Sequence, residues 1–286
     1  MVRTVSILIP TYNRINTFIK VINSYLRQKN LHELIFVDDG SDDGTYEYLQ
    51  EEAKFHPVIK FQRHRENHGV SVARNNGIDL ATGTYILFGE DDLYLPDDYV
   101  STLVDCMDQS KADIIAGRIV YNRVGETFQE TINRCNQYKG PLVNYWLMSG
   151  FYLKNVPDHQ EMPFLHAISL VKSAVCKKIK FDTSFFAREE TDFYLRAIKE
   201  GFRVVFCPHT ICVHLPRDMG KEGGGWRVGV LKYQYLATKN NNMLVDRHYD
   251  ILKQWGMKGN KMTFKLLHLL NRIRIVYLYF RFSIKH

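Results

Sequence analysis

Three consecutive carboxylates are the residues of this sequence best placed to do chemistry. Glu90, Asp91 and Asp92 follow a short apolar run at residues 85–88, after a single glycine. Such a cluster repels itself unless a cation or several hydrogen-bond donors neutralise it. Mn²⁺ and Mg²⁺ take oxygen ligands of this kind and keep part of their water shell. The triplet therefore predicts a divalent metal site.

The first apolar run, at residues 5–10, ends in residues that suit nucleotide binding. These residues are Pro10, Thr11, Tyr12 and Arg14. An aromatic ring can stack on a nucleobase, and an arginine can bind a diphosphate. Taken alone, the same segment is equally well explained as a structural turn.

Two more carboxylates, Asp38 and Asp39, follow the apolar run at residues 34–37. A carboxylate at this place can accept the ring N–H of a pyrimidine or bind a ribose hydroxyl. The alternative is that GSDDGT forms a turn and a helix N-cap. We favour that alternative for Asp42, Asp43 and Thr45.

These segments follow strands of a predicted alternating pattern. We expect strands at residues 5–10, 34–37, 58–63 and 85–88, and helices at 16–27, 45–55 and 70–81. Four strands with three crossover helices predict an α/β fold with a Rossmann-like, mostly parallel sheet flanked by helices. The carboxyl ends of such strands form the ligand-binding edge of the sheet.

The pattern after residue 107 is less regular. Strands are predicted at residues 114–121, 127–134, 167–171 and 203–207, and helices at 141–151, 172–178, 193–200 and 226–248. The glycine-rich run at residues 220–227 is either a solvent loop or a lid that closes over a ligand.

Composition limits the class of protein. A chain of 286 residues with 45% hydrophobic content can bury one large core, or one core and an appendage. Scattered cysteines without a CxxC pair predict neither a disulfide framework nor a zinc knuckle, and they indicate a reducing compartment. The five are Cys106, Cys135, Cys176, Cys207 and Cys212.

Charge is concentrated in the last segment. Residues 251–286 hold eight Lys and Arg and no Asp or Glu, whereas the whole chain carries +7. Basic and apolar residues alternate there, which predicts an amphipathic helix on an anionic membrane. The alternative is that the apolar residues pack on the rest of the chain or on a second subunit. Few small polar groups are present to read bases, so nucleic acid is not the expected partner.

We expect no leader sequence before the first strand, and the apolar stretch at residues 275–280 is too short to span a bilayer. We therefore expect a cytoplasmic protein, peripheral on the inner face of the membrane.

Four segments in order resemble the inverting family 2 glycosyltransferases of the GT-A fold. They are PTYNR, VDDGSDDGT, GVSVARNNGIDLATG and the acidic triplet. The resemblance covers about residues 4–250. It implies a metal-dependent enzyme that moves a sugar from a nucleotide-diphosphate donor, a UDP-sugar being favoured, to a hydroxyl of a glycan or lipid-linked acceptor, as in cell-surface polysaccharide biosynthesis.

The resemblance also divides the chain. It implies a catalytic domain at residues 1–250, with a nucleotide-binding half at 1–107 and an acceptor-side half at 108–250. A basic amphipathic extension at 251–286 follows. A homo-oligomer is compatible with this organisation.

Individual roles follow from the same resemblance. Asp38 matches the aspartate that reads the base, and Arg74 matches a diphosphate contact. Asp92 would be a direct metal ligand and His214, in ICVHLP, a further one. The triplet occupies the position of the family's D-x-D motif, with Glu90 as the first acid, where the family usually has Asp, and Asp91 in the middle.

Three acids compete for the role of general base. They are Glu189, Glu190 and Asp192, in the segment REETDFYLRAIKEGFRV. Alignment with the E-D-x-D motif of the family places Glu190 at the base position, where the family usually has Asp. The alternative is that Glu189 and Glu190 only favour the helix dipole and that Asp192 pairs with Arg196.

Two other functions compete with the transferase. A sugar-nucleotide-binding pseudoenzyme is suggested by the two Glu-for-Asp changes. A sugar-phosphate nucleotidyltransferase would share the fold type, but the first strand is not followed by the glycine-rich loop with arginine that grips a triphosphate.

Overall fold

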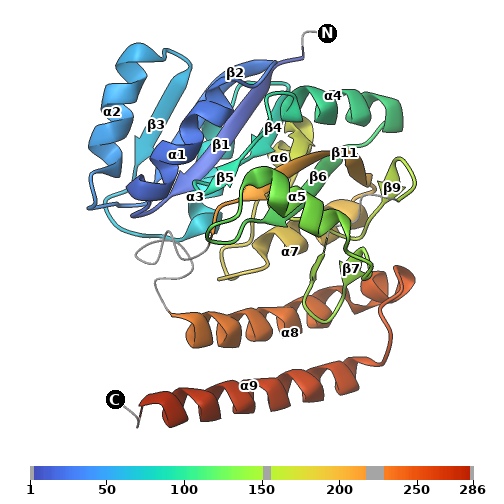
Figure 1. Ribbon diagram of the computed structural model, residues 1–286. Helices are drawn as coiled ribbons and strands as arrows, with labels where there is room; N and C mark the ends of the chain where they lie inside the picture. Colours follow the sequence, from blue (N-terminus) through green and yellow to red (C-terminus); the bar gives the residue numbers. More distant parts are fainter. Residues whose placement is uncertain (1–2, 151–155, 217–228, 284–286) are drawn as a thin grey trace.

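A nine-stranded sheet forms the centre of the protein. The structure, a computed structural model, describes residues 3–150, 156–216 and 229–283 (Figure 1). The strand order is β3-β2-β1-β4-β10-β6-β11-β5, and β9 pairs with β11. Helices pack against this sheet, and two long C-terminal helices form a further layer on one side.

The first part of the chain has the predicted alternation of strands and helices. Strands β1, β2, β3 and β4 are parallel to one another. In sequence order the elements are β1 (Val5–Thr11), α1 (Ile15–Leu26), β2 (Leu31–Asp38), α2 (Thr45–Phe55), β3 (Ile59–Arg63), α3 (Val70–Leu80) and β4 (Tyr85–Phe88). Thr11 pairs with Asp38, so both predicted nucleotide-binding segments begin at the same edge of the sheet.

The sheet continues through the second part of the chain. Strand β10 runs antiparallel between β4 and β6, and β11 runs parallel to β6. The elements are β5 (Leu93–Tyr94), α4 (Tyr99–Ser110), β6 (Ile114–Tyr121), β9 (Gln160–Glu161), β10 (Leu170–Lys172), α6 (Ser173–Lys178), α7 (Glu189–Lys199) and β11 (Val204–His214). One hydrophobic core therefore joins residues on both sides of position 107.

The predicted strand at residues 127–134 is wrong, because this segment forms helix α5 (Phe128–Asn136). Thr127 accepts a hydrogen bond from the Glu130 backbone N–H, and the Glu130 side chain accepts one from the Thr127 backbone. This reciprocal capping box satisfies two donors at the start of the helix. The T-x-x-E pattern at residues 127–130 is the sequence signal of this cap. Its preference for a helix start outweighs the preference of the β-branched residues for a strand.

The predicted helix at residues 141–151 is also wrong. The segment contains two short paired strands, β7 (Val143–Asn144) and β8 (Ser149–Gly150). Asn144 Oδ1 accepts a hydrogen bond from the Leu147 backbone N–H, at 3.1 Å. A side chain that bonds its own turn in this way competes with helix formation.

Two C-terminal helices form the outer layer. Helix α8 (Val230–Gln254) packs on α7, and α9 (Lys261–Ser283) runs back along α8 (Figure 1). Between them the chain reverses at Gly256 and Gly259, which have φ values of 100° and 85°. A side chain would be strained at both positions. The predicted helix at 226–248 thus ends later than expected, while its first residues and the run at 220–227 lie outside the described residues.

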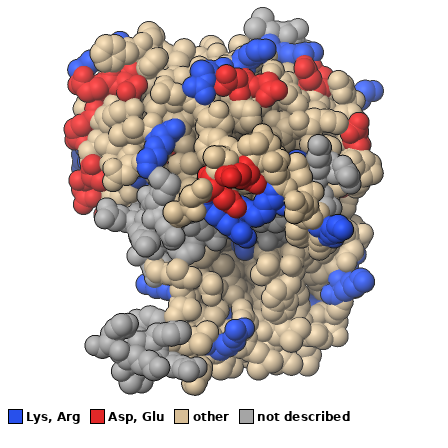
Figure 2. All heavy atoms as spheres, in the orientation of Figure 1, with Lys and Arg blue, Asp and Glu red and all other residues tan. Residues whose placement is uncertain are grey.

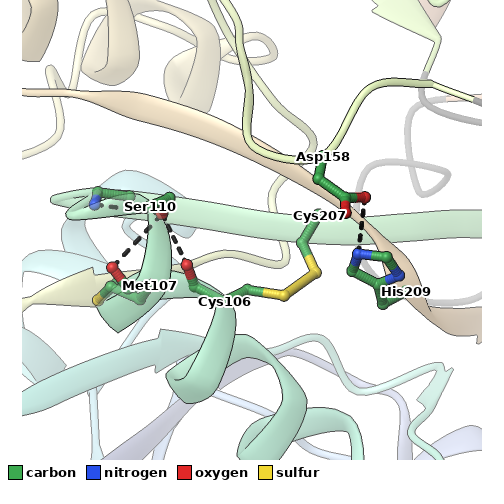
Figure 3. Close-up of a disulfide and its surroundings, with 7 residues drawn as sticks. Cys106, Met107, Ser110, Asp158, Cys207 and His209 are labelled. Atoms are coloured by element: carbon green, nitrogen blue, oxygen red, sulfur yellow. Dashed lines mark hydrogen bonds and ion pairs between the residues drawn. A yellow bond between two sulfur atoms is a disulfide. The ribbon is translucent and has the colours of Figure 1, made fainter.

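Contrary to the sequence-based expectation, two cysteines form a disulfide. Cys106 in α4 and Cys207 in β11 are bonded, as Figure 3 shows, and both are buried. The two positions are 101 residues apart in the sequence. No local spacing pattern can reveal such a pair, because only the packing of α4 on β11 brings the sulfurs together. Cys135, Cys176 and Cys212 are free and buried.

Candidate active site

A cavity of about 590 Å³ lies at the edge of the sheet where the predicted site residues meet. All of them except Asp38 and Asp192 line it. Those that line it are Pro10, Thr11, Tyr12, Arg14, Asp39, Arg74, Glu90, Asp91, Asp92, Glu189, Glu190 and His214. The fold therefore brings together segments from the first and second parts of the chain.

Two carboxylates and one imidazole form a cluster on one side of the cavity. Ligand atoms of Glu90, Asp92 and His214 lie within 4.8 Å of one another. His214 Nε2 lies 3.3 Å from Asp92 Oδ1 and 3.8 Å from Glu90 Oε2. This mixed oxygen and nitrogen donor set suits a divalent transition metal such as Mn²⁺, and Mg²⁺ through its carboxylates.

Backbone pairing brings the cluster together. His214 ends β11, and the next backbone N–H, of Leu215, donates to the Asp92 carbonyl at 2.8 Å. His214 Nδ1 lies 2.8 Å from the Leu215 carbonyl oxygen. Because a carbonyl only accepts, this contact places a proton on Nδ1, and Nε2 faces the carboxylates. Metal-binding histidines are commonly oriented by such a second hydrogen bond.

Arg14 neutralises part of the acidic triplet. Its side chain is 5% exposed and forms ion pairs with Asp92 and, at 3.5 Å from Nε, with Asp91. Burial nevertheless raises the pKa of Asp91 to about 7, with the charge of Arg14 opposing the shift. Burial also raises the pKa of Glu90, and the nearby charge of Asp92 adds to this effect. For Asp91 and Glu90, the nearby positive charges therefore offset only part of the effect of burial.

Arg74 connects the triplet to α7. This buried guanidinium donates from Nη1 to Glu189 Oε1 at 2.6 Å, and its Nη2 lies 3.7 Å from Glu90 Oε1. The ring of Phe181 lies against it, with 5.2 Å between Cζ and the ring centroid. Glu189, which also lines the cavity, therefore has one carboxylate oxygen engaged in an ion pair.

Glu190 and Asp192 have different surroundings. Glu190 lines the cavity, and no side chain in the described part of the chain forms a salt bridge with it. Burial raises its pKa to about 7, and the charge of Glu189 contributes. Asp192 is fully buried outside the cavity lining, and it accepts hydrogen bonds from Arg196 Nε at 2.6 Å and His248 Nε2 at 2.8 Å. The predicted i, i+4 pair of Asp192 with Arg196 is confirmed.

The two aspartates after β2 also differ. Asp38 is fully buried, accepts from the Ser41 backbone N–H at 3.0 Å and lies 3.4 Å from Arg63 Nε. Burial raises its pKa. Asp39 lines the cavity and accepts from the backbone N–H groups of His68 and Gly69, at 2.9 and 2.7 Å. It therefore shapes the loop that leads into α3.

The turn predicted after Asp39 is present. Asp43 accepts from the backbone N–H groups of Ile15 and Thr45, at 2.9 and 3.1 Å. These contacts confirm a structural part for Asp43.

Several residues that the sequence did not single out also line the cavity. They include Tyr121, Met148, His166, Phe186 and Tyr233. Tyr121 ends a predicted strand beside β11, which is the one signal that could have drawn attention to it. His166 Nε2 lies 2.8 Å from the Gly117 carbonyl oxygen, and burial lowers the pKa of this imidazole to about 4. The imidazole is therefore neutral, and its hydrogen bond to Gly117 stabilises this part of the cavity wall.

Sequence comparisons identify the family of this chain. The model of the family described as glycosyl transferase family 2 matches residues 6–179. Glycosyltransferase GlyA of Streptococcus pneumoniae is 29% identical over 186 residues, which are 62% of this chain and 26% of that protein. The uncharacterized glycosyltransferase EpsJ of Bacillus subtilis is 38% identical over 117 residues, 40% of this chain and 33% of that protein. The matches thus span only about a quarter to a third of these relatives.

Solved structures show the same fold at low sequence identity. S. aureus TarS 1–349 in complex with UDP-GlcNAc has a TM-score of 0.59 and 16% identity, and the match covers 96% of this chain and 81% of that one. The mannosyltransferase PcManGT from Pyrobaculum calidifontis, with GDP-Man and Mn²⁺, has a TM-score of 0.61 and 18% identity, with coverages of 94% and 68%. From the family match and this architecture we conclude that the chain belongs to glycosyl transferase family 2 and has the GT-A fold.

Proposed function

We propose that this chain is an inverting, metal-dependent glycosyltransferase. It would move a sugar from a nucleotide-diphosphate donor, with a UDP-sugar favoured, to a hydroxyl of a glycan or lipid-linked acceptor. The observation that carries the proposal is that one cavity is lined both by the cluster of Glu90, Asp92 and His214 and by the carboxylate of Glu190. These are the two groups that such a transfer needs.

The metal would be Mn²⁺ or Mg²⁺, held by Asp92 and His214 with Glu90 beside them. When bound, the ion supplies charge stabilisation for the departing nucleotide diphosphate. The orientation of His214 Nε2 toward the two carboxylates supports this assignment. Two fold neighbours, PcManGT and GalNAc-T7, were solved with Mn²⁺.

The donor would bind along the edge formed by β1 and the loop before α3. Pro10, Thr11 and Tyr12 line this part of the cavity, and Arg14 lies between it and the acidic triplet. Asp39 fixes the Gly69 loop, where the backbone can approach a phosphate closely. TarS, a fold neighbour, was solved with UDP-GlcNAc, which supports the preference for a UDP-sugar.

Glu190 would act as the general base. The acceptor hydroxyl attacks the anomeric carbon from the side opposite the diphosphate, and its proton passes to the Glu190 carboxylate. The new glycosidic C–O bond forms as the bond between the anomeric carbon and the diphosphate oxygen breaks, and the electron pair of that bond stays with the diphosphate. A base with a pKa near 7 is well matched to this step at neutral pH.

A donor panel tests the proposal. UDP-, GDP- and dTDP-sugars are incubated with the protein and candidate acceptors, with and without Mn²⁺, and free nucleotide diphosphate is measured. We expect metal-dependent release of UDP. Binding without turnover would identify a pseudoenzyme, and release of pyrophosphate from a nucleoside triphosphate and a sugar phosphate would identify a nucleotidyltransferase.

The outer face of α9 is the proposed contact with the membrane. Its inner side packs on the rest of the chain through buried Phe264, His268 and Ile275. A stripe of exposed apolar side chains covers the other side, at the spacing of one helical face. The stripe consists of Met262, Leu266, Leu269, Leu270, Ile273, Val276 and Tyr277, with Leu267 at its margin.

The positive charge of the C-terminal segment indicates what kind of surface binds this apolar stripe. Residues 251–286 hold eight basic residues and no acidic one. On the face drawn in Figure 2, the region of α8 and α9 shows blue side chains and no red ones. An anionic lipid surface gains from both the apolar and the basic residues. Within the described residues no helix is long and apolar enough to cross a membrane, so the contact we propose is peripheral.

Membrane contact also fits the acceptor class. A relative from Methanococcus voltae, 24% identical over 76% of this chain, is named as acting on a dolichyl-linked sugar phosphate. A protein that rests on a membrane would have a lipid-linked acceptor within reach.

Flotation with liposomes tests the contact. The full chain is compared with Leu266→Ser/Leu270→Ser/Ile273→Ser on anionic and neutral vesicles at low salt. Phe55→Ser/Val124→Ser, at exposed apolar positions outside the stripe, is the matched control. We expect only the stripe variant to lose binding to anionic vesicles. A full chain that does not float but forms a dimer, which the stripe variant breaks, would show that a second copy covers the stripe.

A further inference from the structure

One face of α8 carries four polar residues that all point to the segment bearing Glu190. Asn240, Asn241, Arg247 and His248 are spaced by 1, 7 and 8 positions, which places them on one side of a helix. Asn240, Asn241 and His248 are buried. Buried polar side chains require partners, and the amide oxygens of Asn240 and Asn241 and Nε2 of His248 have theirs in the segment 182–192. The amide nitrogens of the two asparagines donate elsewhere, to Met243 Sδ and to the Trp146 carbonyl.

The first set of contacts fixes the residue that starts α7. Asn240 Oδ1 accepts from the Ala187 backbone N–H and Asn241 Oδ1 accepts from Arg188 Nε, both at 3.3 Å. Arg188 is the N-cap of α7 and has a φ of 72°. A non-glycine residue rarely adopts this left-handed conformation without support from its surroundings. The two asparagines provide that support.

The second contact fixes the first turn of α7. Asp192 accepts from His248 Nε2 at 2.8 Å on one oxygen and from Arg196 Nε at 2.6 Å on the other. Arg196 belongs to α7 itself, whereas His248 comes from α8. Burial opposes ionisation of Asp192, but the hydrogen bond from His248 and the charge of Arg196 lower its pKa overall. At His248, α8 itself departs from helical geometry, with a φ of −132°.

The third contact holds the loop before α7. Arg247 donates from Nη1 to Asp182 Oδ2 at 2.6 Å, and its guanidinium lies over the Phe185 ring at 5.0 Å. Phe185 is part of the cavity lining. The loop, the N-cap and the first turn of α7 are therefore all held from the same face of α8.

From these contacts we propose that Asn241 and His248 are positioning residues for the general base. His248 fixes the first turn of α7 through its hydrogen bond to Asp192, which belongs to that turn. The inference rests on the proposed function of Glu190. Asp192, one of the three acids considered as base, acts in this scheme through Glu190 and does not itself take the proton. A base displaced by as little as 1 Å loses much of its effect on the rate.

The test compares kcat with donor binding. His248→Phe keeps the ring and removes the donor, and His248→Gln keeps an N–H group of similar reach. We expect His248→Phe to lower kcat by about tenfold to a hundredfold. Binding of UDP with Mn²⁺, measured by calorimetry, should stay within about twofold of the wild type because the α8 face does not line the donor side of the cavity. His248→Gln should recover most of the rate.

A double-variant cycle separates positioning from a general loss of stability. If His248 acts through Glu190, adding His248→Phe to Glu190→Gln should lower the residual rate no further. Asn241→Ala is taken through the same cycle and decides the question if His248→Phe does not fold. Tyr249→Phe is the matched control, since it removes the hydrogen bond to the Gly259 carbonyl from another side of α8.

The outcomes distinguish the two proposals. Absence of transfer by the wild type, or full activity of Glu190→Gln, overturns the proposed function. A different result overturns only this inference. In that case Glu190→Gln loses activity as expected, but the activities of His248→Phe and Asn241→Ala cannot be distinguished from that of Tyr249→Phe. Losses that multiply in the double variants overturn it as well.

Discussion

Two regions supply carboxylates to the cavity, the edge of the sheet and the first turn of α7. At the sheet edge, the acids are held through their main-chain carbonyls: the Leu215 N–H donates to the Asp92 carbonyl, and the Tyr25 hydroxyl donates to the Glu90 carbonyl at 2.7 Å. At α7, side chains from distant elements hold the start of the helix, through Arg74 on Glu189 and His248 on Asp192.

The difference between these regions lies in how each can be perturbed. A sheet edge keeps its backbone pairing when a side chain is changed, so a substitution there should remove one chemical group and little else. A helix start that depends on side-chain partners should be displaced when any partner is removed. The predictions below test this contrast, from the largest expected effect to the smallest.

Asp92→Asn should have the largest effect. The change removes a charge from the proposed metal cluster while the carbonyl of residue 92 can still accept from Leu215. We expect the thermal stabilisation by UDP to lose its dependence on Mn²⁺, and transfer to be abolished, in a protein that remains folded by circular dichroism. Metal-dependent transfer by this variant would remove Asp92 from the metal site.

Glu190→Gln should lower transfer by about a hundredfold or more, the usual contribution of a general base, while donor affinity stays near that of the wild type. The measurement is steady-state transfer together with calorimetric binding of UDP and Mn²⁺. A larger loss of turnover in Glu189→Gln or Asp192→Asn would show that another acid is the base.

The pH dependence of the wild type follows from the same residue. Burial raises the pKa of Glu190 to about 7, so the carboxyl is protonated below that pH and cannot accept the acceptor proton. Transfer should therefore fall as the pH drops through about 7 and level off above it. In Glu190→Gln this acidic limb should disappear, and a limb that persists there belongs to another group.

Tyr25→Phe should have an intermediate effect. It removes the hydroxyl that donates to the Glu90 carbonyl and accepts from the Glu90 backbone N–H, at 2.7 and 3.2 Å. Leaving these groups without a partner costs about 1–3 kcal/mol. We expect a lower free energy of unfolding and weaker Mn²⁺ binding. Tyr48→Phe in α2 is the control, and an equal change in its metal affinity would argue against a specific role for Tyr25.

Thr127→Ala should have the smallest effect. Its capping box in α5 lies outside both regions, so the loss should be about 1 kcal/mol of unfolding free energy, as for other N-caps. Urea denaturation measures this value, and kcat should remain that of the wild type. A change in kcat would mean that α5 influences the cavity, and the contrast between the two regions would have to include it.

Much of the first part of the sheet could be predicted from the sequence. Each buried parallel strand appears as a continuous apolar run, and each ends where polar residues begin, as at Thr11 and Asp38. This local signal placed β1, β2 and β4, and it directed attention to the acidic triplet. The errors at α5 and at β7–β8 came from segments in which capping and turn hydrogen bonds outweigh the apolar pattern.

The sequence by itself determined which residue types stand at the ends of the strands, because strand period and turn chemistry are local properties. Only the tertiary structure decided which of those residues meet. It joined Cys106 to Cys207, placed His214 beside Asp92, and turned Asp192 away from the cavity toward His248. Each of these contacts joins elements far apart in the sequence, so the packing of sheet and helices, and no local pattern, sets the distance between them.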